Sequence, residues 1–324
     1  MLHLRKSSGK AASVEALNEL AHVLSISRRE LDLILRQKAS LFSHFQIPKP
    51  DGQARRIDYP RPKLKIIQRR LLEHLYSTLR IPSYLHGGIP GKTIFTHAQT
   101  HTKQKYVTTC DIANFYDSFR TSHIKPVLSQ AGFTGPALIA VEELSTLDGH
   151  LPHGCPTSCL LANLAFAIVE HEVMKFTKRK GWRYSRYVDD IAISSCNPIK
   201  PHFDIVRSAF SRQGFHLAPH KTRHFQAGDR QIVTNLIVNE KLNPTPTYKK
   251  QLSQTIRLCL NLGPETIASA NGISLRTLKS QLNGQIAHLG RIDKQLSIKY
   301  KRRLYGISWK MPAIDDSQKN ESAS

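Results

Sequence analysis

Aliphatic residues recur with helical spacing over most of the chain. From Ser13 to Gln37 they return every three or four positions, which predicts a helix capped near Ser13, and the polar stretch 27–30 is expected to divide this segment into two helices. The same spacing predicts further helices over residues 64–79, 124–147 with a break at 132–136, 160–178, 203–213, 248–262, 264–271, 274–289 and 292–304.

Short β-prone runs lie between these helices. Residues 107–111, 182–187 and 191–195 are each predicted to form a strand, and the last two are close enough in the chain to form a hairpin. Prolines and a glycine are concentrated between residues 48 and 62, which predicts a turn between two more short strands. The proline-containing segment 242–246 is expected to be a hinge before the last helices.

Two adjacent carboxylates, Asp189 and Asp190, lie at the tip of the predicted hairpin, and Asp111 ends the first β-prone run. Neighbouring like charges repel each other, and an acid at the end of a buried strand is costly to desolvate, unless a cation compensates them. The three acids together offer the hard oxygen ligands that Mg²⁺ prefers, and a metal pair about 4 Å apart can catalyse phosphoryl transfer. The alternative is a solvated turn at Asp189 and Asp190 and a helix cap at Asp111.

These residues resemble the catalytic blocks of reverse transcriptases. Tyr187-Val188-Asp189-Asp190 is similar to the active-site hairpin of that family, and the segment from Asp111 to Tyr116 is similar to its first catalytic block. Five more segments resemble family blocks and follow the same order along the chain: residues 47–57, 64–69, 151–164, 214–221 and 233–239.

The resemblance implies an α+β fold with the right-hand architecture of polymerases. This architecture has fingers, a palm made of an antiparallel sheet backed by helices, and a helical thumb. The expected order is an N-terminal helical region at residues 1–46, fingers and palm at 47–240, the thumb at 241–312 and a disordered tail at 313–324.

Within the family, the compact length and the style of the blocks resemble bacterial retron enzymes and, more loosely, group II intron enzymes. Three positions depart from the retron pattern. His97 replaces the Asn of an Asn-Ala-x-x-His segment, Asn235 replaces the Gly of Val-Thr-Gly, and His153 replaces the Gln that precedes Gly154. A defence-associated or abortive-infection reverse transcriptase is the alternative.

The resemblance implies an RNA-directed DNA polymerase that copies a partner noncoding RNA into cDNA by two-metal nucleotidyl transfer. Its expected partners are template and primer RNA, the cDNA product, deoxynucleoside triphosphates and, in an antiphage defence system, a separate effector protein. An RNA-dependent RNA polymerase and an inactive RNA-binding protein are the other candidates. Tyr116 argues against the RNA polymerase, because the matching bulky residue blocks a ribose 2′-hydroxyl in this family.

The resemblance also assigns roles to individual residues. Asp111, Asp189 and Asp190 are the expected catalytic residues, and with Ile112 they are expected to hold two Mg²⁺ ions, or Mn²⁺ in their place. The expected contacts with the incoming nucleotide come from Lys49, Arg55, Arg56, Ala113, Tyr116, His153, Gly154 and Lys221.

For some of these residues the resemblance implies a specific chemical role, and each role has a structural alternative. The basic residues of the fingers are expected to bind the triphosphate, Ala113 to present its backbone amide to phosphate, and Lys221 to donate a proton to pyrophosphate. The alternatives are surface basicity for the fingers, an exposed helix-end lysine for Lys221 and a plain core aromatic for Tyr116.

Contacts with the template and product strands are expected from Arg69, His97, His101, Pro156, Thr157, Lys249, Lys250, Arg276 and Lys279. The spacing of His97 and His101 would also suit a metal pair on a helix, but no acid accompanies them, so RNA contact or packing is preferred. Any one of the basic thumb residues can instead belong to an ordinary solvated helix face.

Composition agrees with a polyanionic partner. The 47 Lys and Arg residues exceed the 24 Asp and Glu residues, and the formal charge of +23 favours salt-dependent binding of nucleic acid. The five cysteines include no Cys-x-x-Cys pair, so disulfides are not expected, and packing is preferred over a metal site for Cys155 and Cys159 beside His153. No signal peptide or membrane-spanning stretch is recognisable, so we expect a cytoplasmic protein without a membrane partner.

Overall fold

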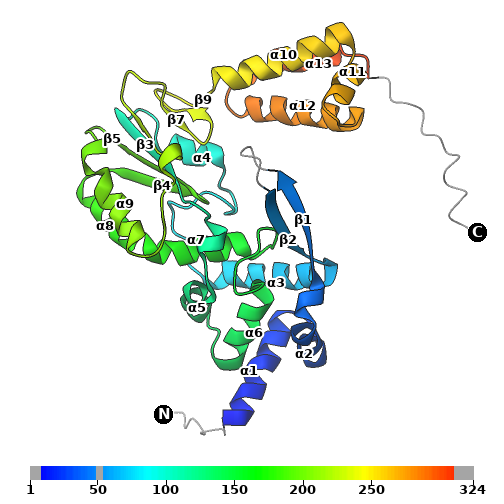
Figure 1. Cartoon of the computed structure of the whole chain (residues 1–324), viewed down its shortest axis with the longest axis vertical. Helices are drawn as coiled ribbons and strands as arrows, with labels where there is room; N and C mark the ends of the chain where they lie inside the picture. Colours follow the sequence, from blue (N-terminus) through cyan, green and yellow to red (C-terminus); the bar gives the residue numbers. More distant parts are fainter. Residues whose placement is uncertain (1–8, 49–53, 310–324) are drawn as a thin grey trace, which may run out of the picture. The chain divides into compact units, whose positions relative to one another are not determined.

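The computed structural model describes residues 9–48 and 54–309, and the chain divides into two compact units between Thr234 and Asn235 (Figure 1). Helices and antiparallel sheets are mixed, as expected for an α+β protein. Within the described residues, no helix is both long enough and apolar enough to cross a membrane. The expected tail at 313–324 lies outside the described residues.

The first unit is built around a four-stranded sheet with the order β4-β5-β3-β6. Its strands are β3 (Tyr106–Asp111), β4 (Arg183–Tyr187), β5 (Asp190–Ser195) and β6 (Arg223–Phe225). A separate two-stranded sheet pairs β1 (Phe42–Pro48) with β2 (Ala54–Pro60), and β7 (Ile232–Val233) ends the unit. Both predicted hairpins are therefore present.

The helices of the first unit are α1 (Gly9–Val23), α2 (Arg28–Arg36), α3 (Pro62–Thr78), α4 (Ile94–Gln99), α5 (Thr121–Gln130), α6 (Gly135–Ser145), α7 (Ser158–Val169), α8 (His171–Arg179) and α9 (Phe203–Ser211). Two short 3₁₀ helices, at Tyr116–Ser118 and Pro219–Lys221, carry residues of the candidate site.

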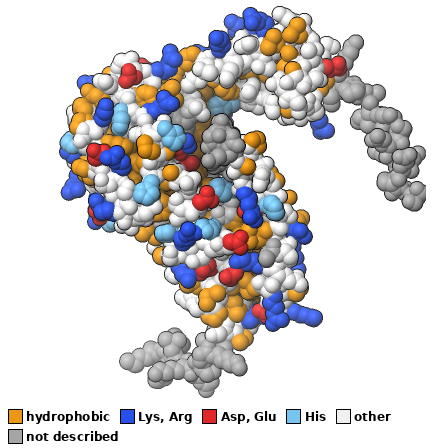
Figure 2. Space-filling view, viewed as in Figure 1, with side chains coloured by type: hydrophobic (Ala, Val, Ile, Leu, Met, Phe, Trp, Pro, Cys, Tyr) orange, Lys and Arg blue, Asp and Glu red, His pale blue; other side chains and the backbone are white. Residues whose placement is uncertain are grey.

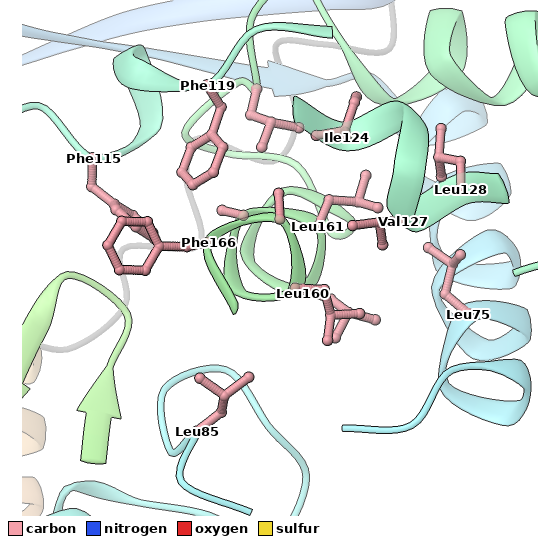
Figure 3. Packing of buried hydrophobic residues seen from close by; sticks show 14 of the residues in the cluster. Leu75, Leu85, Phe115, Phe119, Ile124, Val127, Leu128, Leu160, Leu161 and Phe166 are labelled. Carbon is pink, nitrogen blue, oxygen red and sulfur yellow. The ribbon is translucent and has the colours of Figure 1, made fainter. Parts of the chain in front are cut away.

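Helix α7 lies at the centre of the hydrophobic core. Its buried side chains include Leu160, Leu161 and Phe166, and Figure 3 shows the core residues of neighbouring segments arranged around this helix. Phe166 contacts the ring of Phe115 at a centroid distance of 5.7 Å. Because Phe115 follows Asp111 closely in the chain, the core fixes the segment that leaves the end of β3.

Several helix boundaries differ from the sequence prediction. Helix α1 begins at Gly9, so Ser13 lies inside it and is not a cap, and the break before α2 falls at residues 24–27, where the Ser27 hydroxyl accepts a hydrogen bond from Glu30 N at 3.1 Å. The predicted helix at 160–178 is divided at Glu170, whose side chain is fully buried.

The second unit contains β8 (Leu236–Ile237) and β9 (Asn243–Pro244), which pair with each other, and four helices in its described part. These are α10 (Pro246–Leu262), α11 (Pro264–Ala270), α12 (Leu275–Gly290) and α13 (Lys294–Tyr305). Side chains of Thr245, Ser274 and Asp293 cap α10, α12 and α13. The unit has a hydrophobic core of its own, with Ile256, Leu282 and Leu289 at its centre.

Candidate active site

The turn between β4 and β5 carries Asp189 to the end of the sheet. Tyr187 pairs with Asp190, so Val188 and Asp189 alone form the connection. Val188 has a φ of +59°, which is a strained value for a β-branched residue. Conformations of this kind cost about 1–3 kcal/mol and persist only where the surrounding structure holds them.

Asp111 lies beside this turn because β3 pairs with β5. The register places Asp111 directly opposite Asp190, and directly opposed residues lie on the same face of a sheet with their Cβ atoms about 5 Å apart. The Ile112 amide donates a hydrogen bond to the Asp189 carbonyl at 3.1 Å. The fold thus brings together the three acids that the sequence singled out.

The electrostatics of the three acids follow from their crowding. Burial and the charges of Asp111 and Asp189 raise the pKa of Asp190 to about 7. Burial, followed by the Asp111 carboxylate, also raises the pKa of Asp189 above its ordinary value. The Lys221 ammonium lies 2.6 Å from Asp111 Oδ2, and this hydrogen bond raises the lysine pKa. One ammonium does not neutralise three carboxylates, so the cluster favours additional positive charge.

The donor set fits divalent cations. Three carboxylates offer only hard oxygen ligands, and the raised pKa values of Asp189 and Asp190 reflect burial and repulsion between carboxylates, which a bound cation would relieve. Among the described residues, no three His, Cys, Asp or Glu side chains are already arranged around a metal-sized position. Lys221 pairs with Asp111 instead, and since its side chain is 54% exposed it can move aside for an ion.

A cavity of about 790 Å³ opens beside the acids. It is lined by Ala54, Arg56, Ile112, Ala113, Asn114, Phe115, Tyr116, Asp117, His153, Asp189, Ala218, His220 and Lys221. Five residues of the expected nucleotide-binding set are among them: Arg56, Ala113, Tyr116, His153 and Lys221. The cavity has the size of an ordinary small-molecule site.

Tyr116 forms part of the cavity wall. Its ring lies 4.9 Å from the His153 ring, and His153 Nε2 lies 3.4 Å from Asp117 Oδ1. Burial, followed by the adjacent Cys159, raises the pKa of the Tyr116 hydroxyl above its ordinary value. The phenol is therefore neutral, and its ring is held between the core and the cavity.

Ala113 and Gly154 do not contribute as expected. The Ala113 amide donates to the His216 carbonyl at 2.8 Å, so the prediction that it is presented to phosphate was wrong. Gly154 packs against β2, where its amide donates to Asp58 O at 3.0 Å and an added Cβ would lie 2.7 Å from the same oxygen. It fixes the loop to the strand and is absent from the lining of the cavity.

Two other expected phosphate ligands are Lys49 and Arg55. Lys49 lies outside the described residues. Arg55 lies in β2 with its backbone opposite Ile47. Their expected roles remain predictions.

The histidines expected to contact RNA are buried. His97 is 1% exposed and His101 is 0% exposed, and His101 lies beyond the end of α4, so the two do not share a helix. The ring nitrogens of His101 are each 2.7 Å from a hydroxyl, Ser194 Oγ on β5 and Ser185 Oγ on β4. Burial lowers the pKa of His97 to about 3 and that of His101 well below its ordinary value. Packing is thus the alternative that fits, because a side chain without exposed surface cannot contact RNA.

The remaining expected nucleic-acid contacts differ in exposure. Thr157, at the start of α7, is buried, whereas Arg69 on α3 is exposed. In the second unit, Lys250, Arg276 and Lys279 are exposed and Lys249 is half-buried. Pro156, in the first unit, is half-buried. The Lys279 ammonium also lies 5.5 Å from the centre of the Trp309 ring.

Sequence reasoning missed several residues near the acids. Asn114, Asp117 and His220 line the cavity, and only their nearness in sequence to Asp111 and Lys221 could have suggested them. It also missed Arg186, which lies fully buried against Glu170 beneath the turn. A basic residue in a predicted strand next to the two acids was the available signal.

Comparisons with known proteins agree with this site. The family model described as reverse transcriptase (RNA-dependent DNA polymerase) matches residues 47–240, which include all three acids. The chain is also similar to proteins named as retron reverse transcriptases. The Retron Se72 reverse transcriptase of Salmonella heidelberg (strain 579083-10) is 30% identical over 194 residues, which cover 59% of this chain and 51% of that protein.

Other relatives match over more of the chain. The Retron Mx162 reverse transcriptase of Myxococcus xanthus is 28% identical over 306 residues, covering 82% of this chain and 62% of that protein. The Retron Ec48 reverse transcriptase of Escherichia coli is 26% identical over 328 residues, covering 94% of this chain and 79% of that protein. The chain therefore spans about half to two thirds of the length of the first two relatives.

Proposed function

Because this chain belongs to the family of reverse transcriptases (RNA-dependent DNA polymerases), we propose that it copies an RNA template into DNA at the cavity beside Asp111, Asp189 and Asp190. The observation that carries the proposal is the register of β3 and β5, which sets Asp111 opposite Asp190 and next to the turn that bears Asp189. In the right-hand architecture, β1 and β2 would belong to the fingers, the four-stranded sheet to the palm, and α10 to α13 to the thumb.

The three acids and the Ile112 carbonyl would hold two Mg²⁺ ions, which when bound lower the pKa of a primer hydroxyl and neutralise the triphosphate. Divalent ions are in general use in this family. The remaining chemistry belongs to the chain itself. Arg56 projects from β2 at the cavity and can bind a phosphate with two parallel hydrogen bonds. Lys221 is protonated at neutral pH, its pKa is raised further by the hydrogen bond to Asp111, and it can give its proton to departing pyrophosphate.

Substitution of the acids tests the proposal. Asp111→Asn and Asp189→Asn keep the shape of each side chain and remove its charge, so incorporation of deoxynucleotides on a primed RNA should fall by about 10³-fold. Binding of the same RNA, measured by fluorescence anisotropy, should change less than about threefold.

Asp204→Asn is the matched control, because this side chain is 79% exposed on α9. It should extend primers like the unchanged protein. If both active-site variants still extend primers, the three acids are not the catalytic residues.

The relatives' names carry the finer part of the proposal. They name retron reverse transcriptases and so support a retron enzyme. We further propose that its template is a partner noncoding RNA and that it works with an effector protein in antiphage defence. Sequencing the nucleic acid that copurifies with the chain is the test. One abundant RNA together with a DNA copy of part of it is expected, and a mixture of unrelated cellular RNAs would contradict a retron assignment.

A further inference from the structure

The Arg186 side chain is fully buried directly beneath the turn that carries Asp189. Its guanidinium forms a two-pronged ion pair with Glu170, with Nε 2.6 Å from Oε1 and Nη2 3.1 Å from Oε2. Glu170 is itself fully buried at the junction between α7 and α8 and accepts a further hydrogen bond from the Tyr184 hydroxyl. The charge of each partner is therefore compensated inside the core.

The other guanidinium donors reach the turn and its support. Nη1 donates to the Val188 carbonyl at 2.7 Å and to Asn163 Oδ1 at 2.8 Å, and Nη2 donates to the Asn163 carbonyl at 2.9 Å. With the two bonds to Glu170, all five N–H groups of the guanidinium are used. Lysine has three donors on a single nitrogen and cannot make this set of bonds.

The same network also contacts the turn through Gly87. Asn163 Nδ2 donates to the Gly87 carbonyl at 2.8 Å, and Gly87 packs so closely that an added Cβ would lie 2.4 Å from Val188 Cγ2. The Arg186 guanidinium also stacks on Phe166 and Phe115, with distances of 4.9 and 5.7 Å to the ring centres. Phe115 belongs to the segment that follows Asp111, so Arg186 contacts both acid-bearing segments.

Stability alone does not account for this arrangement. A buried ion pair is often no more stabilising than apolar residues of similar volume, because both charges must be desolvated. What an apolar pair cannot do is hold the Val188 carbonyl while Val188 keeps a φ of +59°.

We propose that Arg186 is a positioning residue for the reaction, which fixes Val188 in its left-handed conformation and thereby aims Asp189 at Asp111. The inference rests on the proposed function. It predicts that the network orients the acid without itself touching the substrate.

Two variants separate positioning from folding. Arg186→Lys keeps the charge but loses the hydrogen bonds to the turn. The double variant Arg186→Met with Glu170→Leu replaces the ion pair by apolar side chains and is expected to fold. Both should lower kcat for deoxynucleotide incorporation by about 100-fold and change KM by less than about threefold, since a misplaced catalytic group slows chemistry more than binding.

The control for lost stability is Leu144→Ala, a buried residue of α6 outside the hydrogen-bond network of Arg186. When each protein is assayed at the same number of degrees below its own Tm, Leu144→Ala should keep kcat within about threefold of the unchanged protein. Hydrogen–deuterium exchange gives a second readout that does not depend on activity. The amides of residues 188–190 should exchange at least about tenfold faster in both Arg186 variants and at the normal rate in Leu144→Ala.

The two readouts distinguish the two proposals. If the unchanged protein extends no primer, the proposed function fails, and the exchange rates still decide whether Arg186 holds the turn. The positioning role is overturned if both Arg186 variants keep kcat within threefold, if exchange at 188–190 is unchanged, or if Leu144→Ala loses as much kcat.

Discussion

At the residue scale, the chemistry of the site depends on what surrounds each carboxylate. Asp189 and Asp190 are half-buried and adjacent to Asp111, so removal from water and mutual repulsion both disfavour their charged forms. Lys221 offsets only part of this cost. The excess negative charge destabilises the folded chain when no cation is bound, and it favours the binding of cations.

Asp190→Asn tests this balance through the pH dependence of stability. The pKa of Asp190 rises from its ordinary value of 3.8 to about 7, so the folded state holds this proton more tightly than the unfolded chain does. The resulting stability is complete below pH 3.8 and is lost as the pH rises through 7. In EDTA at pH 8, Asp190→Asn should therefore raise the free energy of unfolding by about 2 kcal/mol.

Denaturant unfolding at pH 4 and pH 8 measures the effect. The variant and the unchanged protein should be equally stable at pH 4, and Mg²⁺ at pH 8 should stabilise the unchanged protein more than the variant. Asp204→Asn keeps Asp190 and should therefore match the unchanged protein at both pH values. Equal stability of Asp190→Asn and the unchanged protein at both pH values would contradict a raised pKa at Asp190.

Tyr116→Val tests the wall of the cavity at the same scale. The smaller side chain leaves room for a ribose 2′-hydroxyl, so the preference for deoxynucleotides over ribonucleotides should fall by at least about tenfold in kcat/KM. Competition between dATP and ATP in primer extension measures the preference. An unchanged ratio would assign Tyr116 to core packing alone.

At the element scale, the hairpin of β4 and β5 is held by buried polar contacts as well as by its backbone ladder. His101 joins Ser185 on β4 to Ser194 on β5, and its lowered pKa keeps the ring neutral, so one ring nitrogen donates and the other accepts. The junction between α7 and α8 also supports this hairpin, because the buried Glu170 at the junction pairs with Arg186 on β4.

His101→Ala should destabilise the protein by about 2–4 kcal/mol, because it leaves a cavity and two hydroxyls without partners. Thermal or denaturant unfolding measures the loss. At temperatures where the variant is folded, its affinity for RNA should stay within about threefold of normal. His22→Ala, at an exposed position of α1, should leave stability nearly unchanged. A selective loss of RNA affinity in His101→Ala would show that the histidine contacts RNA after all.

At the scale of the whole molecule, excess positive charge accompanies the candidate site. Figure 2 shows Lys and Arg side chains spread over the surface of both units. The second unit has its own core and presents Lys250, Arg276 and Lys279 to solvent. The formal charge of +23 belongs to the complete chain and so favours a long polyanion over a small anionic ligand.

Affinity for a primed RNA should accordingly fall steeply with salt. Each phosphate contact contributes about 0.7–0.9 to the slope of log K against log salt concentration, so Arg276→Ala and Lys250→Ala should each reduce the slope by about that amount if they bind phosphate. Anisotropy titrations between 50 and 300 mM KCl, roughly the range over which such contacts weaken, measure the slope. Glu265→Gln, on α11 of the same unit, should leave it unreduced. Unchanged slopes in both basic variants would place the RNA elsewhere.

The sequence by itself determined the local structure and the chemical type of the site. Both hairpins follow from apolar spacing and from proline and glycine, because these signals act over a few residues. So do the helices between residues 64 and 304, apart from α4 and the division between α7 and α8. The chemical type of the site could also be inferred from the sequence, since Asp189 and Asp190 are neighbours in the chain and their charges require compensation wherever they lie.

Only the tertiary structure decided which distant residues meet. Asp111 reaches Asp190 through strand register, and Glu170, between α7 and α8, pairs with Arg186. His101 is buried between two strands that lie more than 80 residues further along the chain. Spacing along the sequence carries no information about such contacts. They arise when a buried charge or polar group must find a partner in the packed core, and many different partners would satisfy the same local pattern.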